Sequence, residues 1–325
     1  MTNDTDCTTL QSYSYMSEQI TKYIGVFLYI ICLFGTVLNI LTLLQRTYKT
    51  RSCTLYLITA SACDFAHLNL EPLSNILQYG FNYDWTINSL IYCKTKSYLA
   101  YVFTVTSGTL TTSASITQYF LSSDKSTRWY YARRHIGIRC IKFTFIFWFI
   151  VSIPILFCSD RFYHIFQKER LICSNPARHI YCYTVQLLYI CLFNGFLPPF
   201  IMLIFGLLTH RNVHHLGQRT RHKSIRIQRI NQQLISMLIL QAIKSTIASI
   251  PYSIFNCYWL STISNHKALL LQAKENLIHQ FSYLLFWSNY TSFFIYIYSS
   301  QIFRHQCMKA LKKIICCRSG ERERR

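Results

Sequence analysis

The sequence predicts an all-α membrane protein, a seven-transmembrane helix bundle with an amphipathic eighth helix. Two observations predict it. Apolar stretches of roughly twenty residues or more recur along the chain, long enough to cross a bilayer core as helices, and basic residues gather in alternate connecting segments. Lipid admits only helices or closed barrels, and stretches this long are not the short alternating strands of a barrel. The expected spans lie near residues 21–44, 53–77, 89–121, 137–158, 179–209, 230–260 and 277–302.

The connecting segments give the expected orientation. Most of the 33 basic residues follow the first, third and fifth stretches or lie in the tail. The positive-inside rule places these segments in the cytoplasm and the N-terminus outside the cell. The net charge of +21 is then mostly a topology signal. We expect no nucleic-acid partner, because a nucleic-acid binder carries its basic residues on a soluble face. The expected division is an extracellular N-terminus (1–20), a transmembrane domain (21–302) and a cytoplasmic amphipathic helix with a basic tail (303–325).

Both ends of the chain fit this topology. Residues 1–20 contain no Lys or Arg, and Asn3 opens an Asn-Asp-Thr acceptor for N-glycosylation. The first apolar stretch is too long for a separate signal peptide, so we expect it to serve as the membrane signal. Residues 303–317 mix apolar and basic side chains and should lie in the membrane plane against anionic lipid. Cys316 and Cys317 end this segment as expected sites of S-palmitoylation.

The 14 cysteines divide by compartment. Cys93 opens the third stretch and Cys173 lies in the outer loop after the fourth, where an oxidising exterior favours a disulfide between them. Two unrelated thiols are the alternative, since a sequence alone does not fix pairing. A second bridge stays open among the other cysteines near the outer face, Cys7, Cys158, Cys182 and Cys257.

Asn39 and Asp64 in the first two spans, Cys93 at the start of the third and Pro251 in the sixth resemble marks of the rhodopsin-like G-protein-coupled receptors, and the resemblance covers nearly the whole chain. The segment after Pro198-Pro199 is similar to invertebrate peptide receptors. The resemblance implies a plasma-membrane receptor that binds an extracellular ligand and acts on a heterotrimeric G protein and on arrestin. It also implies helix bends at Pro199 and Pro251. The matching positions are Asn39, Asp64, Trp85, Cys93, Trp148, Pro251 and Tyr296 with Phe303 after it.

Three motifs of that family are altered. The Asp-Arg-Tyr motif falls at Thr117, Gln118 and Tyr119, so both charged members are missing and the pair stays neutral. The Cys-Trp-x-Pro motif falls on the segment that ends at Pro251, and Ser249 stands where the family has Trp. The Asn-Pro-x-x-Tyr motif begins with Ser292-Phe293 and ends at Tyr296. Because the family's Arg contacts the G protein, Gln118 predicts altered or weakened switching.

Charged residues inside spans indicate a polar core. Each costs about 2.5–3.5 kcal/mol at a helix centre and therefore needs a partner or water. In the family, the residue equivalent to Asp64 lines a pocket that can hold sodium; a hydrated structural carboxylate is the alternative. Lys244 either reaches Asp64 and replaces the sodium ion, or extends along its own stem toward the inner interface. The expected neighbours of the core are Asn39, Ser107, Ser288, Asn289 and Ser292.

The outer halves of the spans give the candidate ligand contacts. Glu71 precedes Pro72, and its carboxylate is expected either to accept a cation of the ligand or to bond internally to a Tyr or Ser. Amine receptors carry an Asp seven residues after the Cys of the third span. Here Ala100 stands at that position, followed by Tyr101, so a peptide is favoured over a monoamine.

Other function classes are disfavoured by the motifs. The sequence has no Gly-rich phosphate loop, His-Glu-x-x-His or nucleophile elbow, so we expect no enzyme, and we expect no cofactor and no metal centre. An atypical or decoy receptor with little G-protein coupling remains an alternative. A transporter or channel is another, although the internal repeats and broken helices usual in transporters are not visible.

Overall fold

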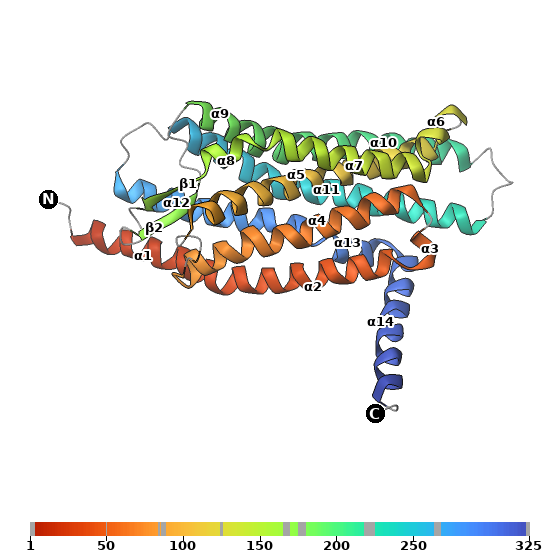
Figure 1. Cartoon of the computed structure of the whole chain (residues 1–325), viewed down its shortest axis with the longest axis horizontal. Helices are drawn as coiled ribbons and strands as arrows, with labels where there is room; N and C mark the ends of the chain where they lie inside the picture. The colour runs from red at the N-terminus through yellow and green to blue at the C-terminus, as the bar shows by residue number, and fades with distance from the viewer. Residues whose placement is uncertain are drawn as a thin grey trace.

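The computed structural model describes residues 4–49, 51–83, 85, 89–123, 126–164, 170–174, 180–217, 225–262 and 268–322. Within these residues the chain is almost entirely helical. The long helices run side by side along the longest axis, and α14 leaves the bundle at a steep angle (Figure 1). We call the end that carries the two strands the hairpin end, and the opposite end, which carries α14, the α14 end.

Helices occupy each range in which the sequence predicts a span. The last unit begins earlier than expected, at Leu269, and α14 begins at Gln301. The elements in chain order are α1 (Asp4–Ile20), η1 (Thr21–Gly25), α2 (Val26–Leu43), α3 (Arg46–Lys49), α4 (Ser52–Asn75), η2 (Ile76–Gly80), α5 (Leu90–Leu121), α6 (Ser126–Tyr131), α7 (Arg134–Val151), α8 (Pro154–Cys158), β1 (Asp160–His164), β2 (Arg170–Ser174), α9 (Ile180–Leu187), η4 (Leu188–Phe196), α10 (Leu197–Gly217), α11 (Ile225–Thr262), α12 (Leu269–Trp287), η5 (Ser288–Tyr290), α13 (Ser292–Ser299) and α14 (Gln301–Arg322).

A short hairpin is the addition to the expected all-α fold. Strands β1 and β2 pair antiparallel, with Asp160 opposite Ser174 and Arg161 opposite Cys173. Both strands contact α5. The hairpin therefore closes over one end of the central helix.

Helix α5 occupies the centre of the bundle. It contacts α4, α7, α8, α10, α11 and η4. Its Ser and Thr hydroxyls bond to carbonyls one turn earlier in the same helix, as Thr109 does to Val105 and Thr112 to Gly108. These bonds satisfy the hydroxyls, so a helix rich in small polar residues packs closely against its neighbours. Helix α5 is therefore the central helix of the described bundle.

Four helical units within the described residues are long and apolar enough to cross a membrane. They are Thr8–Leu43, Arg134–Cys158, Thr184–Val213 and Gln232–Thr262. The unit of α7 and α8 is the most exposed of them, with 17% of its apolar window buried. Helices this apolar on an outward face indicate association with a membrane.

The N-terminal segment is a helical extension of the first span. Helix α1 continues through the π-helical η1 into α2, so the expected boundary at residue 20 falls within continuous helix. Segment η1 packs against η2. A Cβ at Gly80 would lie 3.0 Å from Lys22 Cα, so this close approach of two backbones requires glycine.

The two prolines expected to bend helices differ in effect. Helix α11 continues through Pro251 without a break. Pro199 lies in the first turn of α10, directly after the π-helical η4, so the irregular backbone precedes this proline.

Candidate functional site

The centre of the bundle holds a polar site built from α4 and α5. Asp64 of α4 accepts a 2.5 Å hydrogen bond from Ser107 Oγ of α5. The carboxylate is half-buried, and Ser107 is buried. The expected neighbourhood of Asp64 and Ser107 is thus present.

A second pair of contacts joins α11 to the break between α12 and α13. Lys244 Nζ donates to the backbone carbonyl of Asn289 at 2.9 Å, and Asn289 Nδ2 donates to Ser249 Oγ at 3.0 Å. Ser292 Oγ also donates to the Asn289 carbonyl, at 3.3 Å. Asn289 is therefore held through both its backbone and its side chain.

Lys244 and Asp64 interact electrostatically but form no direct ion pair. The expected contact between them is replaced by the bond from Lys244 to Asn289 O. Nor does Lys244 extend away from the core, because its ammonium bonds to a carbonyl at the bundle centre. Both alternatives from the sequence thus need correction: the lysine turns inward, and its direct partner is a backbone oxygen.

A cavity of about 60 Å³ lies beside these groups. By the volume that one water needs, it has room for roughly four water molecules. Among the described residues, Gln241 Oε1 and Asn289 Oδ1 are buried acceptors without a protein donor. The residues that line the cavity are Asp64, Thr104, Ser107, Gly108, Thr111, Asn194, Pro198, Pro199, Met202, Gln241, Ser245, Ser249, Phe286, Asn289 and Tyr290.

The oxygen donors around this cavity fit a hard monovalent cation in their chemistry. A carboxylate and two amide oxygens are ligands that such ions prefer. The nearby ammonium of Lys244 opposes a second positive charge, because it interacts with the same carboxylate. The lining is therefore suited to water, and the charge of Lys244 weakens its fit to sodium.

Two other scaffold residues make contacts across helices. Asn39 Nδ2 of α2 donates to Ser61 Oγ of α4 at 2.8 Å. Trp148 Nε1 of α7 donates to Thr109 Oγ1 of α5 at 2.9 Å. Asn39 therefore joins α2 to α4 at Ser61, one helical turn before Asp64.

The candidate ligand contacts differ from the expectation. Glu71 pairs with Lys96 of α5, with 3.5 Å between Oε2 and Nζ. The lysine side chain is 4% exposed and the glutamate 36%. The sequence predicts a ligand cation or a hydroxyl partner for Glu71, and a protein lysine is present instead. Sequence reasoning missed Lys96, because only the packing of α4 against α5 brings its ammonium to Glu71.

Ala100 and Tyr101 face neighbouring helices. The Ala100 carbonyl lies 3.1 Å from His67 Nδ1 of α4. Tyr101 packs edge-on against Tyr189 of η4, with ring centroids 5.9 Å apart. Ala100 is buried, so it offers no surface to a ligand.

Three pairs of cysteines lie at disulfide distance within the described residues. Cys93 and Cys173 form the expected pair, with Cα atoms 5.7 Å apart. The open second bridge joins Cys158 to Cys182. The third pair is Cys191 with Cys257. Sequence reasoning did not select Cys191, because this residue lies within an apolar stretch.

The altered switch motif lies at the α14 end of α5. Thr117 and Gln118 are buried, Gln118 with 2% exposure. Tyr119 packs edge-on against Phe205 of α10 at 5.4 Å between ring centroids. The neutral Gln118 thus occupies a site inside the bundle, where an unpaired charge would be costly.

The junction of α13 and α14 contains the expected aromatic contact and an unexpected polar one. Tyr296 packs edge-on against Phe303 at 5.6 Å between ring centroids. Gln233 Oε1 of α11 accepts bonds from Ser300 Oγ at 2.6 Å and from Ile302 N at 3.0 Å. Sequence reasoning missed Gln233, since its partners lie almost seventy residues away.

Three predicted modification sites lie outside what can be described. Asn3 is outside the described residues. Cys316 and Cys317 belong to α14, but their side chains are also outside the described residues.

No protein-family model matches this sequence, and no curated protein matches it. The resemblance to a receptor family therefore depends on the residues and contacts above.

Proposed function

We propose that this chain is a seven-transmembrane receptor of the rhodopsin-like type in the plasma membrane, with its hairpin end outside the cell. The four apolar units supply four spans. The other three are α4, α5 and the α12–α13 unit, whose polar residues turn toward the interior. Polar groups that face the bundle centre are compatible with a membrane span because they find partners there. Helix α14 then lies along the inner membrane surface as an eighth helix.

The observation that carries the proposal is the polar core. Asp64 and Ser107 join α4 to α5, and Lys244 and Asn289 join α11 to the α12–α13 break. Asp64, Ser107 and Asn289 line one cavity, which residues of α5 and α11 also border. Helix α11 is the element that moves in a receptor of this type. In such a receptor an inactive and an active conformation are in equilibrium. A ligand at the hairpin end shifts this equilibrium only by the difference between its affinities for the two conformations.

The ligand that we propose is an extracellular peptide with a cationic group. Glu71 is the more exposed partner of its ion pair, so its carboxylate is accessible to a competing cation. The test is the response of Glu71→Gln to any peptide that activates the natural chain. A peptide with a cationic side chain should lose potency, and an unchanged response would exclude this role for Glu71.

The proposed cytoplasmic partners are a heterotrimeric G protein and arrestin. The neutral Gln118 favours weak coupling, so an atypical or decoy receptor is the second candidate. The experiment is expression in cells with a peptide library and separate readouts for G protein and arrestin, alongside Gln118→Arg. A ligand-dependent signal in either readout supports a transducing receptor. Ligand binding without a signal, even for Gln118→Arg, supports the decoy.

Sodium provides a separate test of the core. We expect Lys244 to exclude the ion, so sodium chloride and choline chloride should raise the unfolding temperature of the purified protein equally. The unfolding temperature of Lys244→Met should then rise more in sodium chloride than in choline chloride. Adding Asp64→Asn to this variant should abolish that difference. Sodium-specific stabilisation of the natural chain would show that Lys244 does not replace the ion.

A further inference from the structure

The α14 end of α7 carries a stripe of exposed basic side chains. His135, Arg139 and Lys142 are exposed and follow the i, i+4, i+7 spacing of one helix face. The sequence contains no Asp or Glu between residues 126 and 159. Of the described carboxylates, none is within ion-pairing distance of these three cations. The stripe is therefore a positive surface that no carboxylate in the described part of the chain neutralises.

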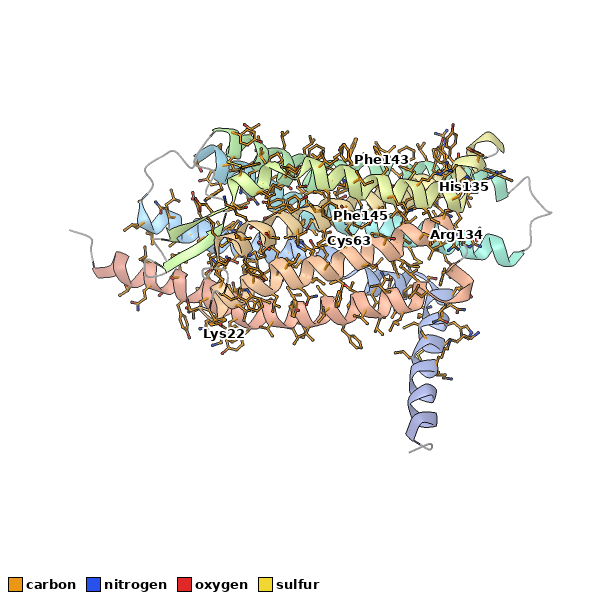
Figure 2. The ribbon with its side chains drawn as sticks, in the orientation of Figure 1. Lys22, Cys63, Arg134, His135, Phe143 and Phe145 are labelled. Atoms are coloured by element: carbon orange, nitrogen blue, oxygen red, sulfur yellow. A yellow bond between two sulfur atoms is a disulfide. The ribbon has the colours of Figure 1, made fainter. Side chains whose placement is uncertain are left out.

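The same helix face continues as an apolar surface. Phe143 follows Arg139 by four residues and is 70% exposed, and Phe147 follows after four more. The two rings are stacked, with centroids 6.1 Å apart. Figure 2 shows His135 near the start of α7 and Phe143 further along it. The face thus changes from cationic to apolar along one line.

Aromatic side chains border the cationic part. Trp129, Tyr130 and Tyr131 are all exposed. The Arg133 guanidinium lies over the Tyr130 ring at 5.1 Å, and the Tyr130 and His135 rings are 6.2 Å apart. Exposed Trp and Tyr beside basic residues are typical of the level at which lipid headgroups begin.

We propose that this face of α7 binds one anionic phospholipid. The headgroup phosphate contacts His135, Arg139 and Lys142, and an acyl chain lies along Phe143 and Phe147. The thirteen residues from His135 to Phe147 rise about 18 Å along the helix, a little more than half of the roughly 30 Å hydrocarbon core. A protein partner would meet the cations but would leave the apolar half uncovered, so the combined stripe favours lipid.

A photoreactive residue tests this placement. Benzoylphenylalanine replaces Phe143 in one variant and Phe157, which is 74% exposed on α8, in another. Each protein is placed in nanodiscs of phosphatidylcholine with a small fraction of phosphatidylinositol 4-phosphate, and crosslinked lipids are identified by mass spectrometry. We expect the anionic lipid to be enriched at position 143 and to match its bulk fraction at 157. Equal fractions at the two positions would overturn the proposal.

Charge variants separate the site from general attraction. Arg139→Gln/Lys142→Gln should weaken the enrichment by about 30-fold, as expected from the loss of two basic residues at the membrane surface. The matched control Lys309→Gln/Lys312→Gln neutralises two exposed cations of α14 and should leave the lipid enrichment at position 143 unchanged. Equal loss in both variants, or full displacement by millimolar inorganic phosphate, would contradict a lipid site on α7.

Discussion

Ser300 Oγ donates a 2.6 Å hydrogen bond to Gln233 Oε1 and so joins α11 to the start of α14. The same Gln233 oxygen accepts from Ile302 N, while Ser300 Oγ accepts from Phe303 N at 3.0 Å. Two of the free N–H groups in the first turn of α14 are therefore satisfied. One amide of α11 thus fixes where α14 begins.

Gln233→Ala should destabilise the protein. The substitution leaves Ser300 Oγ and Ile302 N without their acceptor, at a cost of about 1–3 kcal/mol in the free energy of unfolding. The midpoint of thermal unfolding in detergent measures this loss of stability. Gln232→Ala, at an exposed neighbouring position, is the matched control and should change the midpoint little. Equal midpoints for the two variants would show that the Gln233 bonds contribute nothing.

Asp64 and Lys244 should be energetically coupled although they do not touch. Both charges lie in the polar core and interact electrostatically. Asp64→Asn, Lys244→Met and the double variant form a double-mutant cycle, read as unfolding free energy in detergent. We expect a coupling of about 0.5 kcal/mol or more. Strict additivity would mean that each group is compensated independently.

Gly195→Ala should be poorly tolerated. A Cβ there would lie 1.9 Å from Ser253 Oγ and 2.8 Å from Ser253 Cβ on α11, so η4 and α11 must separate. Overpacking of this kind costs about 1–3 kcal/mol. Gly108→Ala is the control, because its nearest neighbour would be 3.6 Å away. The unfolding midpoint of Gly195→Ala should fall well below that of Gly108→Ala, and Ser253→Ala should partly restore it.

The Glu71–Lys96 pair should respond asymmetrically to removal of its members. Glu71→Gln leaves a buried ammonium without its counter-charge, whereas Lys96→Met leaves a half-exposed carboxylate that water still reaches. The midpoint of thermal unfolding should therefore fall further for Glu71→Gln than for Lys96→Met. The reverse order would indicate that solvent reaches Lys96 and not Glu71.

Local features of the sequence predicted the positions of the helices well. From apolar length alone, the first span is expected to end at residue 44, and α2 ends at Leu43. The Cys93–Cys173 pair, for which the sequence left two unrelated thiols as the alternative, is also present. Such properties depend on a few consecutive residues.

Partners across helices could not be predicted in the same way. Glu71 meets Lys96, Gln233 meets Ser300, and Lys244 meets a backbone carbonyl. Each contact depends on how far a helix is rotated about its axis and how deep it lies. A helix that is apolar on all sides carries little periodic signal for that rotation.

The sequence by itself determined the apolar lengths, the charge asymmetry and the positions of the polar residues within each helix. Only the tertiary structure decided which polar groups meet, and it placed Asn289 between Lys244 and Ser249. The physical reason is that apolar length reports the solvent around a helix. Small-residue packing and interhelical hydrogen bonds, which form only after association, decide its neighbours.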